Sequence, residues 1–256
     1  MNEIAAAISA ECLKLRRTLA LRVAIAAPLA VVALQVFVST QQPDIPRAGA
    51  TPLRGLIQGG FFLWTLIVLP MYGALAAAVV AAVDHQDDHW KQLFALPIRR
   101  SSILIGKWVS TATLVFISFL VLGAGLLTLA AVLRAIRPGW PPEPGLLRLA
   151  GVRMAESFLA AWLSVSIQLW VSLRWRSFTV GVAVGIVAVL VMLGLVARGG
   201  GRNTLTRLYP WALPVTAIAR IAESTPNRTT AAVRGSAGGI LVALVAGWSL
   251  GRREWW

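Results

Sequence analysis

Long runs without charged side chains constrain the fold of this chain most, and Phe61–Val83 is one of them. A bilayer core about 30 Å thick requires about 20 consecutive apolar residues in helical form, and this run supplies them. Residues of the AVILMFWYC set make up 57% of the chain and charged residues only 13%, whereas an ordinary soluble chain is about a quarter charged. The composition therefore predicts a protein that lies in lipid, and it excludes a disordered, collagen-like or disulfide-stapled chain.

Five further apolar runs predict an all-α integral membrane protein with six transmembrane helices, in a single domain over residues 1–256. The third run is too long for a bilayer, since at about 1.5 Å per residue it reaches roughly 46 Å. We expect part of it to tilt or to project into water, with Lys107 at its wet end. The predicted spans are Leu19–Val38, Phe61–Val83, Ile103–Leu133, Met154–Leu173, Phe178–Ala197 and Ser236–Leu250.

The charge pattern sets the expected orientation of these spans. Six spans place both termini on one side of the membrane, and lysine and arginine are denser in the short segments on that side. A higher density of basic residues predicts that the termini are cytoplasmic. The net charge of +14 lies between apolar runs rather than along one stripe, so it favours anionic lipid headgroups over nucleic acid as a partner.

Residues 1–18 are typical of an interfacial helix. Ile4, Ile8, Cys12 and Leu15 follow one another at steps of three or four residues, which places them on one face of a helix. Such a helix lies along the membrane surface rather than across it. The basic residues that immediately precede the first span suit the anionic inner leaflet, and they are Lys14, Arg16 and Arg17.

Proline and glycine gather in the segments that we expect outside, which are 41–60, 134–153 and 198–235. The last of these contains an apolar stretch, Leu208–Ile221, that Pro210 and Pro214 interrupt. Since a structureless loop of this length is uncommon, we predict a broken, re-entrant or interfacial element between the fifth and sixth spans. Its aromatic residues at headgroup depth would be Tyr209 and Trp211. An ordinary surface loop is the alternative.

Several common motifs are missing from the sequence. It contains no G-x-x-x-x-G-K-[ST] phosphate loop, and also no H-E-x-x-H, G-x-S-x-G or C-x-x-C motif. We therefore expect a chain that is not itself an enzyme and holds no cofactor. The one acid inside a predicted span is Glu156, and Arg153 one helical turn earlier predicts an ion pair. An ion-coupled secondary transporter, the first alternative function, would need buried carboxylates or an inverted repeat.

The segment Asp84–Ser102, after the second span, has three possible interpretations. His85 and His89 are four residues apart on a helix, and Asp88 could join them, so a metal site in a membrane enzyme is one alternative. A solvated helix end is the second. The third is a docking surface for a partner protein, because apolar residues share one side of the helix that follows: Trp90, Leu93, Phe94 and Pro97.

Glycine pairs at four-residue spacing predict close helix packing in lipid. The pairs are Gly181/Gly185, Gly235/Gly239 and Gly247/Gly251.

Several segments, taken in order, resemble the permease subunits of type-2 ABC exporters. A basic segment, residues 10–18, leads into a first span that contains Ala27-Pro28, and the run from Leu69-Pro-Met-Tyr72 ends in Asp84. The motifs Trp90-Lys91, Leu96-Pro97-Ile98-Arg99 and Gly106-Lys107-Trp108 follow. The resemblance is strongest to the branch found in bacteriocin, lantibiotic and bacitracin self-protection systems. One departure is Asp84, where that branch would have glutamate.

This resemblance implies an ATP-driven exporter of the bacterial inner membrane that moves amphipathic peptides or lipids. Two six-span permeases, identical or different, would bind two copies of a separately encoded cytoplasmic ATPase, which would carry the ATP and Mg. The segment between the second and third spans would be a coupling helix in a cleft of the ATPase, beside the N-terminal helix. The residues implied in coupling are Asp84, Asp87, Asp88, Trp90, Lys91, Leu93, Phe94, Pro97 and Arg99.

Overall fold

The computed structural model describes residues 9–11, 13–14, 18–47, 49–85, 100–175, 177–199, 203–218 and 225–251. Over these ranges the chain is helical and contains no strand. Six helices are long and apolar enough to cross a membrane, which confirms the predicted all-α class and the number of spans. The helices that form them are α2 (Leu19–Thr40), α3 with α4 (Pro52–Leu63 and Leu69–His85), α6 (Arg100–Ile136), α7 (Leu146–Arg174), α8 (Phe178–Gly199) and α11 (Thr225–Gly251).

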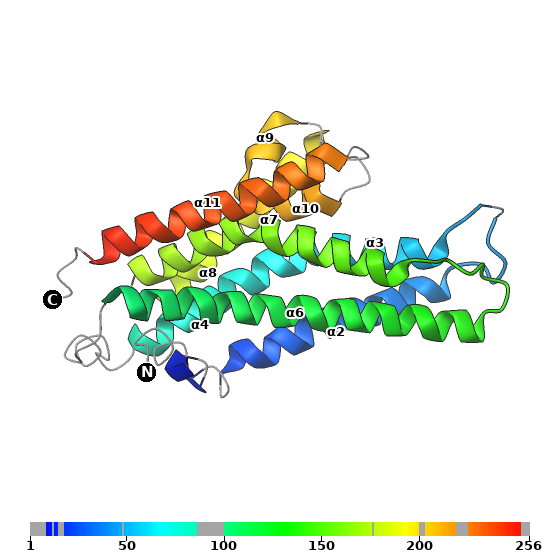
Figure 1. Cartoon of the computed structure of the whole chain (residues 1–256), viewed down its shortest axis with the longest axis horizontal. Helices are drawn as coiled ribbons and strands as arrows, with labels where there is room; N and C mark the ends of the chain where they lie inside the picture. Colours follow the sequence, from blue (N-terminus) through cyan, green and yellow to red (C-terminus); the bar gives the residue numbers. More distant parts are fainter. Residues whose placement is uncertain are drawn as a thin grey trace.

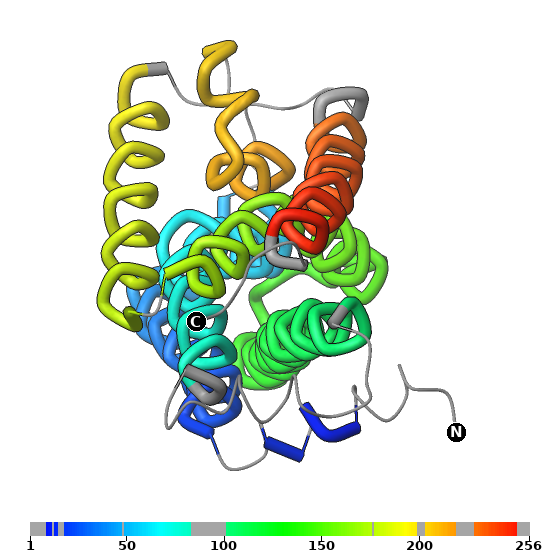
Figure 2. Tube along the Cα trace, turned by 90° about the vertical axis from the view of Figure 1, so that its left-hand side faces the viewer, coloured from blue at the N-terminus to red at the C-terminus, as the bar shows by residue number. Residues whose placement is uncertain are grey.

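Most of the long helices run along the longest axis of the molecule (Figure 1). The end of α4, the beginning of α6 and the end of α11 lie at one end of this bundle, which we call the inner end. Helix α8 is the exception. Figure 2 shows it along its length while α6 is seen nearly end-on, so α8 crosses α6 steeply. Three short helices lie between α8 and α11, and they are α9 (Thr204–Leu208), η4 (Pro210–Ala212) and α10 (Leu213–Ile218).

Three helices begin earlier than the sequence predicts, at Pro52, Leu146 and Thr225. The segments expected as outer loops, 41–60, 134–153 and 198–235, are therefore partly helical. At Pro52 the cause is a cap supplied from another loop. The carboxylate of Glu143 accepts hydrogen bonds from the backbone N–H groups of Leu53 and Arg54, each at 2.9 Å. These are amides at a helix N-terminus, which have no partner inside the helix.

The second span contains a wider turn. A π-helical segment, Trp64–Val68 (η1), joins α3 to α4, and the three together form one continuous helix. Pro70 has no backbone N–H, so the regular hydrogen-bond ladder is interrupted at this point. The side-chain hydroxyl of Thr65 donates to the carbonyl of Phe61 at 2.9 Å, which satisfies one carbonyl of the region.

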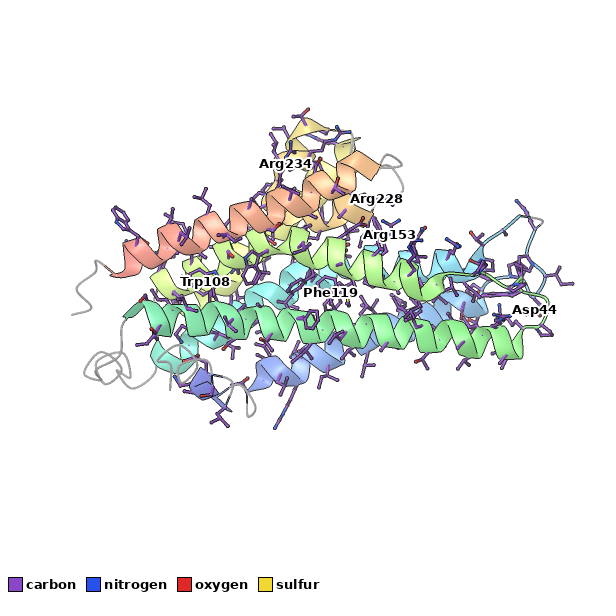
Figure 3. All side chains as sticks on the ribbon, in the orientation of Figure 1. Asp44, Trp108, Phe119, Arg153, Arg228 and Arg234 are labelled. Atoms are coloured by element: carbon purple, nitrogen blue, oxygen red, sulfur yellow. The ribbon has the colours of Figure 1, made fainter. Side chains whose placement is uncertain are left out.

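Helix α7 lies at the centre of the bundle, where it contacts α3, α4, α6, α8, α10 and α11. Aromatic rings fill the space between α3–α4, α6 and α7. The ring of Phe119 meets those of Trp64 and Phe158 edge to face, with centroids 6.0 and 6.2 Å apart. Phe119 is marked on α6 in Figure 3.

Two of the three predicted glycine pairs lie where helices pack closely. A Cβ atom at Gly235 would lie 2.4 Å from the Cα of Ala160, and one at Gly239 would lie 2.3 Å from the ring of Trp162. Gly185 likewise faces Ala74 of α4, at 2.3 Å from that residue's Cβ. Gly247, by contrast, faces open space. The contacts between α7 and α11 and between α4 and α8 therefore depend on the missing side chains.

We expect Gly235→Ala to destabilise the protein by about 1 to 3 kcal/mol, because the new methyl group meets backbone atoms that cannot move aside. The matched control is Gly151→Ala on α7, where a Cβ atom meets nothing within 4 Å. That change is expected to be neutral or slightly stabilising. Thermal unfolding of the purified chain in detergent measures both. Equal midpoints for the two variants would contradict the close contact of α7 and α11.

Candidate functional site

A buried ion cluster lies at the inner end of the bundle. Lys107, two turns into α6, is 0% exposed. Its ammonium donates a hydrogen bond to the carbonyl of Val80 on α4 at 3.3 Å. It also forms an ion pair with the carboxylate of Glu11, with 3.6 Å between Nζ and Oε2. The cluster therefore joins the N-terminal segment, α4 and α6.

Glu11 bridges two cations. Its side chain is 7% exposed, and its Oε1 atom accepts a hydrogen bond from the ammonium of Lys14 at 2.9 Å. Lys14 lies three residues later and is about one third exposed. Of the predicted membrane-interface residues of the N-terminal segment, Lys14 thus pairs with a buried acid, while Arg16 and Arg17 lie outside the described residues.

The expectation that Lys107 marks a wet helix end is wrong within this chain, because its side chain is fully buried. A charge surrounded by apolar helices is retained only when it has a partner. The sequence does not indicate this partner, because Glu11 and Lys107 lie far apart along the chain. The one feature of the sequence that could have indicated a buried ion pair is a single lysine, Lys107, inside a long apolar run.

The segment predicted to dock on an ATPase begins and ends beside this cluster. Helix α4 carries Asp84 in its last turn, and α6 begins at Arg100, with Ser102 buried. The remaining predicted coupling residues lie outside the described residues, and they are Asp87, Asp88, Trp90, Lys91, Leu93, Phe94, Pro97 and Arg99. His89 does too, so the alternative metal site on His85 and His89 stays untested. The structure thus describes the two helices that hold this segment.

An apolar groove with a volume of about 790 Å³ lies between α6, α7 and α11. It covers the inner half of α6, from Ser101 to Phe116, and the last turns of α11. The indole of Trp108, marked in Figure 3, donates a hydrogen bond to the hydroxyl of Ser166 at 3.2 Å. Because its polar atom is bound inside the bundle, Trp108 presents mainly hydrocarbon to the groove. Its other aromatic lining residues are Phe116, Phe158 and Trp162.

The opposite, outer end is fastened by contacts between loops. Arg137 forms an ion pair with Asp44 at 3.6 Å and donates a hydrogen bond to the carbonyl of Gln42 at 3.1 Å. The guanidinium of Arg137 also lies over the ring of Trp140, 5.0 Å from its centroid. The Trp140 indole in turn donates to the carbonyl of Pro43 at 3.2 Å. The loops that follow α2 and α6 are thereby held together.

The segment between α8 and α11 consists of short helices that pack against α7, α8 and α11. The hydroxyl of Tyr209 donates a hydrogen bond at 3.0 Å to the carbonyl of Ala188, halfway along α8. Burial raises the pKa of the Tyr209 phenol above its ordinary value. Trp211 is buried against Val189 and Met192. The location of Tyr209 and Trp211 at headgroup depth stays a prediction.

These features together define a multi-pass membrane protein, with loops held together at the outer end and an ion cluster beside the segment that joins two spans. Comparison with family models identifies the family. The model described as "ABC-2 family transporter protein" matches residues 7–193, and the chain belongs to this family. Membership identifies the chain as the membrane subunit of an ABC transporter and implies an ABC ATPase partner. A search of curated proteins gave no match.

We expect Glu11→Gln to destabilise the protein by about 1 to 3 kcal/mol, because it removes a carboxylate that pairs with the buried ammonium of Lys107. Adding Lys107→Met to this variant also removes the buried cation, so the double variant should recover part of the loss. The control, Lys14→Gln, removes the more exposed partner and should cost about 1 kcal/mol or less. Chemical unfolding in mixed detergent micelles measures all three. Equal losses for Glu11→Gln and Lys14→Gln would contradict the role given to the buried pair.

Proposed function

We propose that this chain is the transmembrane subunit of an ABC exporter that a separately encoded cytoplasmic ATPase drives. The family match supports the general class. The absence of a phosphate loop from the sequence supports a division of labour in which ATP and Mg bind to the partner. In this proposal the chain is not an enzyme, although the assembled complex hydrolyses ATP.

The observation that carries the coupling proposal is the buried ion cluster of Glu11, Lys107 and the Val80 carbonyl. A partner that pushes on the segment between α4 and α6 needs a rigid attachment on both sides. The ion cluster fixes α4, α6 and the N-terminal segment to one another, so that displacement of one of them displaces the others. Residues 86–99 are then the coupling segment, with its apolar side in a groove of the ATPase.

The apolar groove supports the proposed class of substrate, which is an amphipathic peptide or a lipid-like molecule. It lies between membrane-spanning helices in their inner half, where a molecule with a hydrocarbon part can reach it from the bilayer. Export would move such a molecule from the membrane or the cell to the outside. The resemblance to the bacitracin and lantibiotic self-protection branch points the same way.

Two permease copies, or this chain with a homologous permease, and two ATPase copies complete the proposed complex. We place it in the bacterial inner membrane with both termini in the cytoplasm, because the basic residues are denser in the segments on that side. The short helices between α8 and α11 form the re-entrant outer element in this arrangement.

Substitution of the apolar side of the coupling segment tests this proposal. We expect Trp90→Ala or Phe94→Ala to weaken ATPase binding by at least about tenfold, since truncating a central aromatic anchor commonly costs about 2 kcal/mol or more. Binding is measured by titrating the purified ATPase into the reconstituted chain, together with ATP turnover of the complex. The chain alone should hydrolyse no ATP.

The control for this experiment is the double variant His85→Ala and His89→Ala, which should bind the ATPase normally. Unchanged thermal unfolding of every variant shows that the helix bundle is intact. The proposal would be overturned if the histidine variant lost transport while Trp90→Ala and Phe94→Ala bound the ATPase normally. That result would favour the metal site.

A further inference from the structure

Two arginine side chains converge where α7 and α11 approach one another near the outer end. The helices run parallel, because Gly235 faces Ala160 and, further along both, Gly239 faces Trp162. Seven residues before Ala160 comes Arg153, and seven before Gly235 comes Arg228. An offset of two turns on both helices brings these two residues to the same level. Figure 3 marks them on the neighbouring helices.

This cluster holds more positive than negative charge. Glu156 pairs with Arg153 at 3.0 Å, as the sequence predicts, and the positive charge of Arg228 also acts on Arg153. Helices α7 and α11 carry no acid other than Glu156 over their described lengths. Over the described lengths of these two helices there is therefore one carboxylate, which pairs with Arg153, near two guanidiniums.

The charge excess is buried and incompletely bonded. Arg153 is 4% exposed, and although its Nη1 atom donates to Glu156, its Nε atom has no hydrogen-bond partner. Arg228 is half-buried, and its Nε atom also has no partner. Buried polar atoms in proteins nearly always have a partner, and an unpaired buried charge is costly. Two unpartnered donors in one cluster indicate that a further acceptor binds there.

From this arrangement we infer that Arg153 and Arg228 form a binding site for a phosphate group. A guanidinium offers paired donors that match the oxygens of phosphate, and it is the side chain most often used for that purpose. The level of the site favours a phospholipid headgroup, because Arg228 lies in the first turn of α11 and precedes the apolar stretch of that helix. Headgroups lie at the ends of spans. Free inorganic phosphate has the same chemistry and is the other source to test.

The test measures the thermal unfolding midpoint of the full chain in micelles of a maltoside detergent, which carries no phosphate, followed by tryptophan fluorescence. One arm compares micelles with and without added phosphatidylglycerol, and the other compares inorganic phosphate with chloride at equal ionic strength in the detergent alone. A ligand at tenfold excess over its Kd should raise the midpoint by about 3 to 6 °C. A rise with phosphatidylglycerol identifies the lipid headgroup as the ligand, and a rise with inorganic phosphate identifies the free ion.

Matched variants locate the effect. Arg153→Gln and Arg228→Gln should each abolish the rise, whereas Arg148→Gln, an exposed arginine on the same helix, should leave it unchanged. Glu156→Gln should enlarge the rise, because it frees Nη1 of Arg153 for the ligand. This variant and Arg228→Gln keep the test decisive if Arg153→Gln does not fold.

Three results would overturn the inference. One is the absence of a rise in both arms, and another is an equal rise in Arg148→Gln, Arg153→Gln and Arg228→Gln, which would mean a general effect of surface charge. The third is a rise that occurs only in Glu223→Gln. Glu223 precedes α11 and lies outside the described residues, and this result would mean that its carboxylate fills the site.

Discussion

The arrangement of the bundle depends on how closely other helices approach α7. In lipid the hydrophobic effect does not hold helices together, so association relies on packing and on interhelical hydrogen bonds. Helix α11 approaches α7 at Gly235, which faces the backbone of Ala160, and at Gly239, which faces Trp162. Glycines of α8 do the same against α4. These two contacts bring α11 and α8 to opposite sides of the short helices α9, η4 and α10, which fill the space between them.

The lipid solvent also explains why the few buried charges have partners. Lys107 pairs with Glu11 at the inner end, Glu143 caps α3 at the outer end, and Arg153 pairs with Glu156 between them. The first two interactions each join a helix to a distant part of the chain. The Lys107–Glu11 pair fixes the helices that hold the proposed coupling segment, and the Glu143 cap fixes α3 to the loop that follows α6. The arginine cluster differs, because its positive charge is not fully balanced.

The sequence predicts the class and number of spans correctly, because a charge-free run such as Phe61–Val83 has one stable solution in a bilayer. It misplaces helix starts where a cap comes from elsewhere, as at Pro52, whose helix depends on Glu143. Composition alone marked that region as a loop. The Glu11–Lys107 pair could not be predicted for a similar reason, since it joins distant residues and depends on tertiary packing. The apolar groove between α6, α7 and α11 leaves no local signal either, because its lining residues resemble those of any lipid-facing surface.

The central claim is that the connection between α4 and α6 receives the ATPase at the cytoplasmic end of the bundle. Site-specific photocrosslinking in intact cells tests it most directly, with a photoreactive amino acid in place of Lys91 and, as the matched control, in place of Ile45, which is 81% exposed in an outer loop. We expect position 91 to form a covalent conjugate with an ABC ATPase subunit and position 45 to form none. An ATPase conjugate from position 45, or none from position 91 in cells that contain the assembled complex, would contradict the claim.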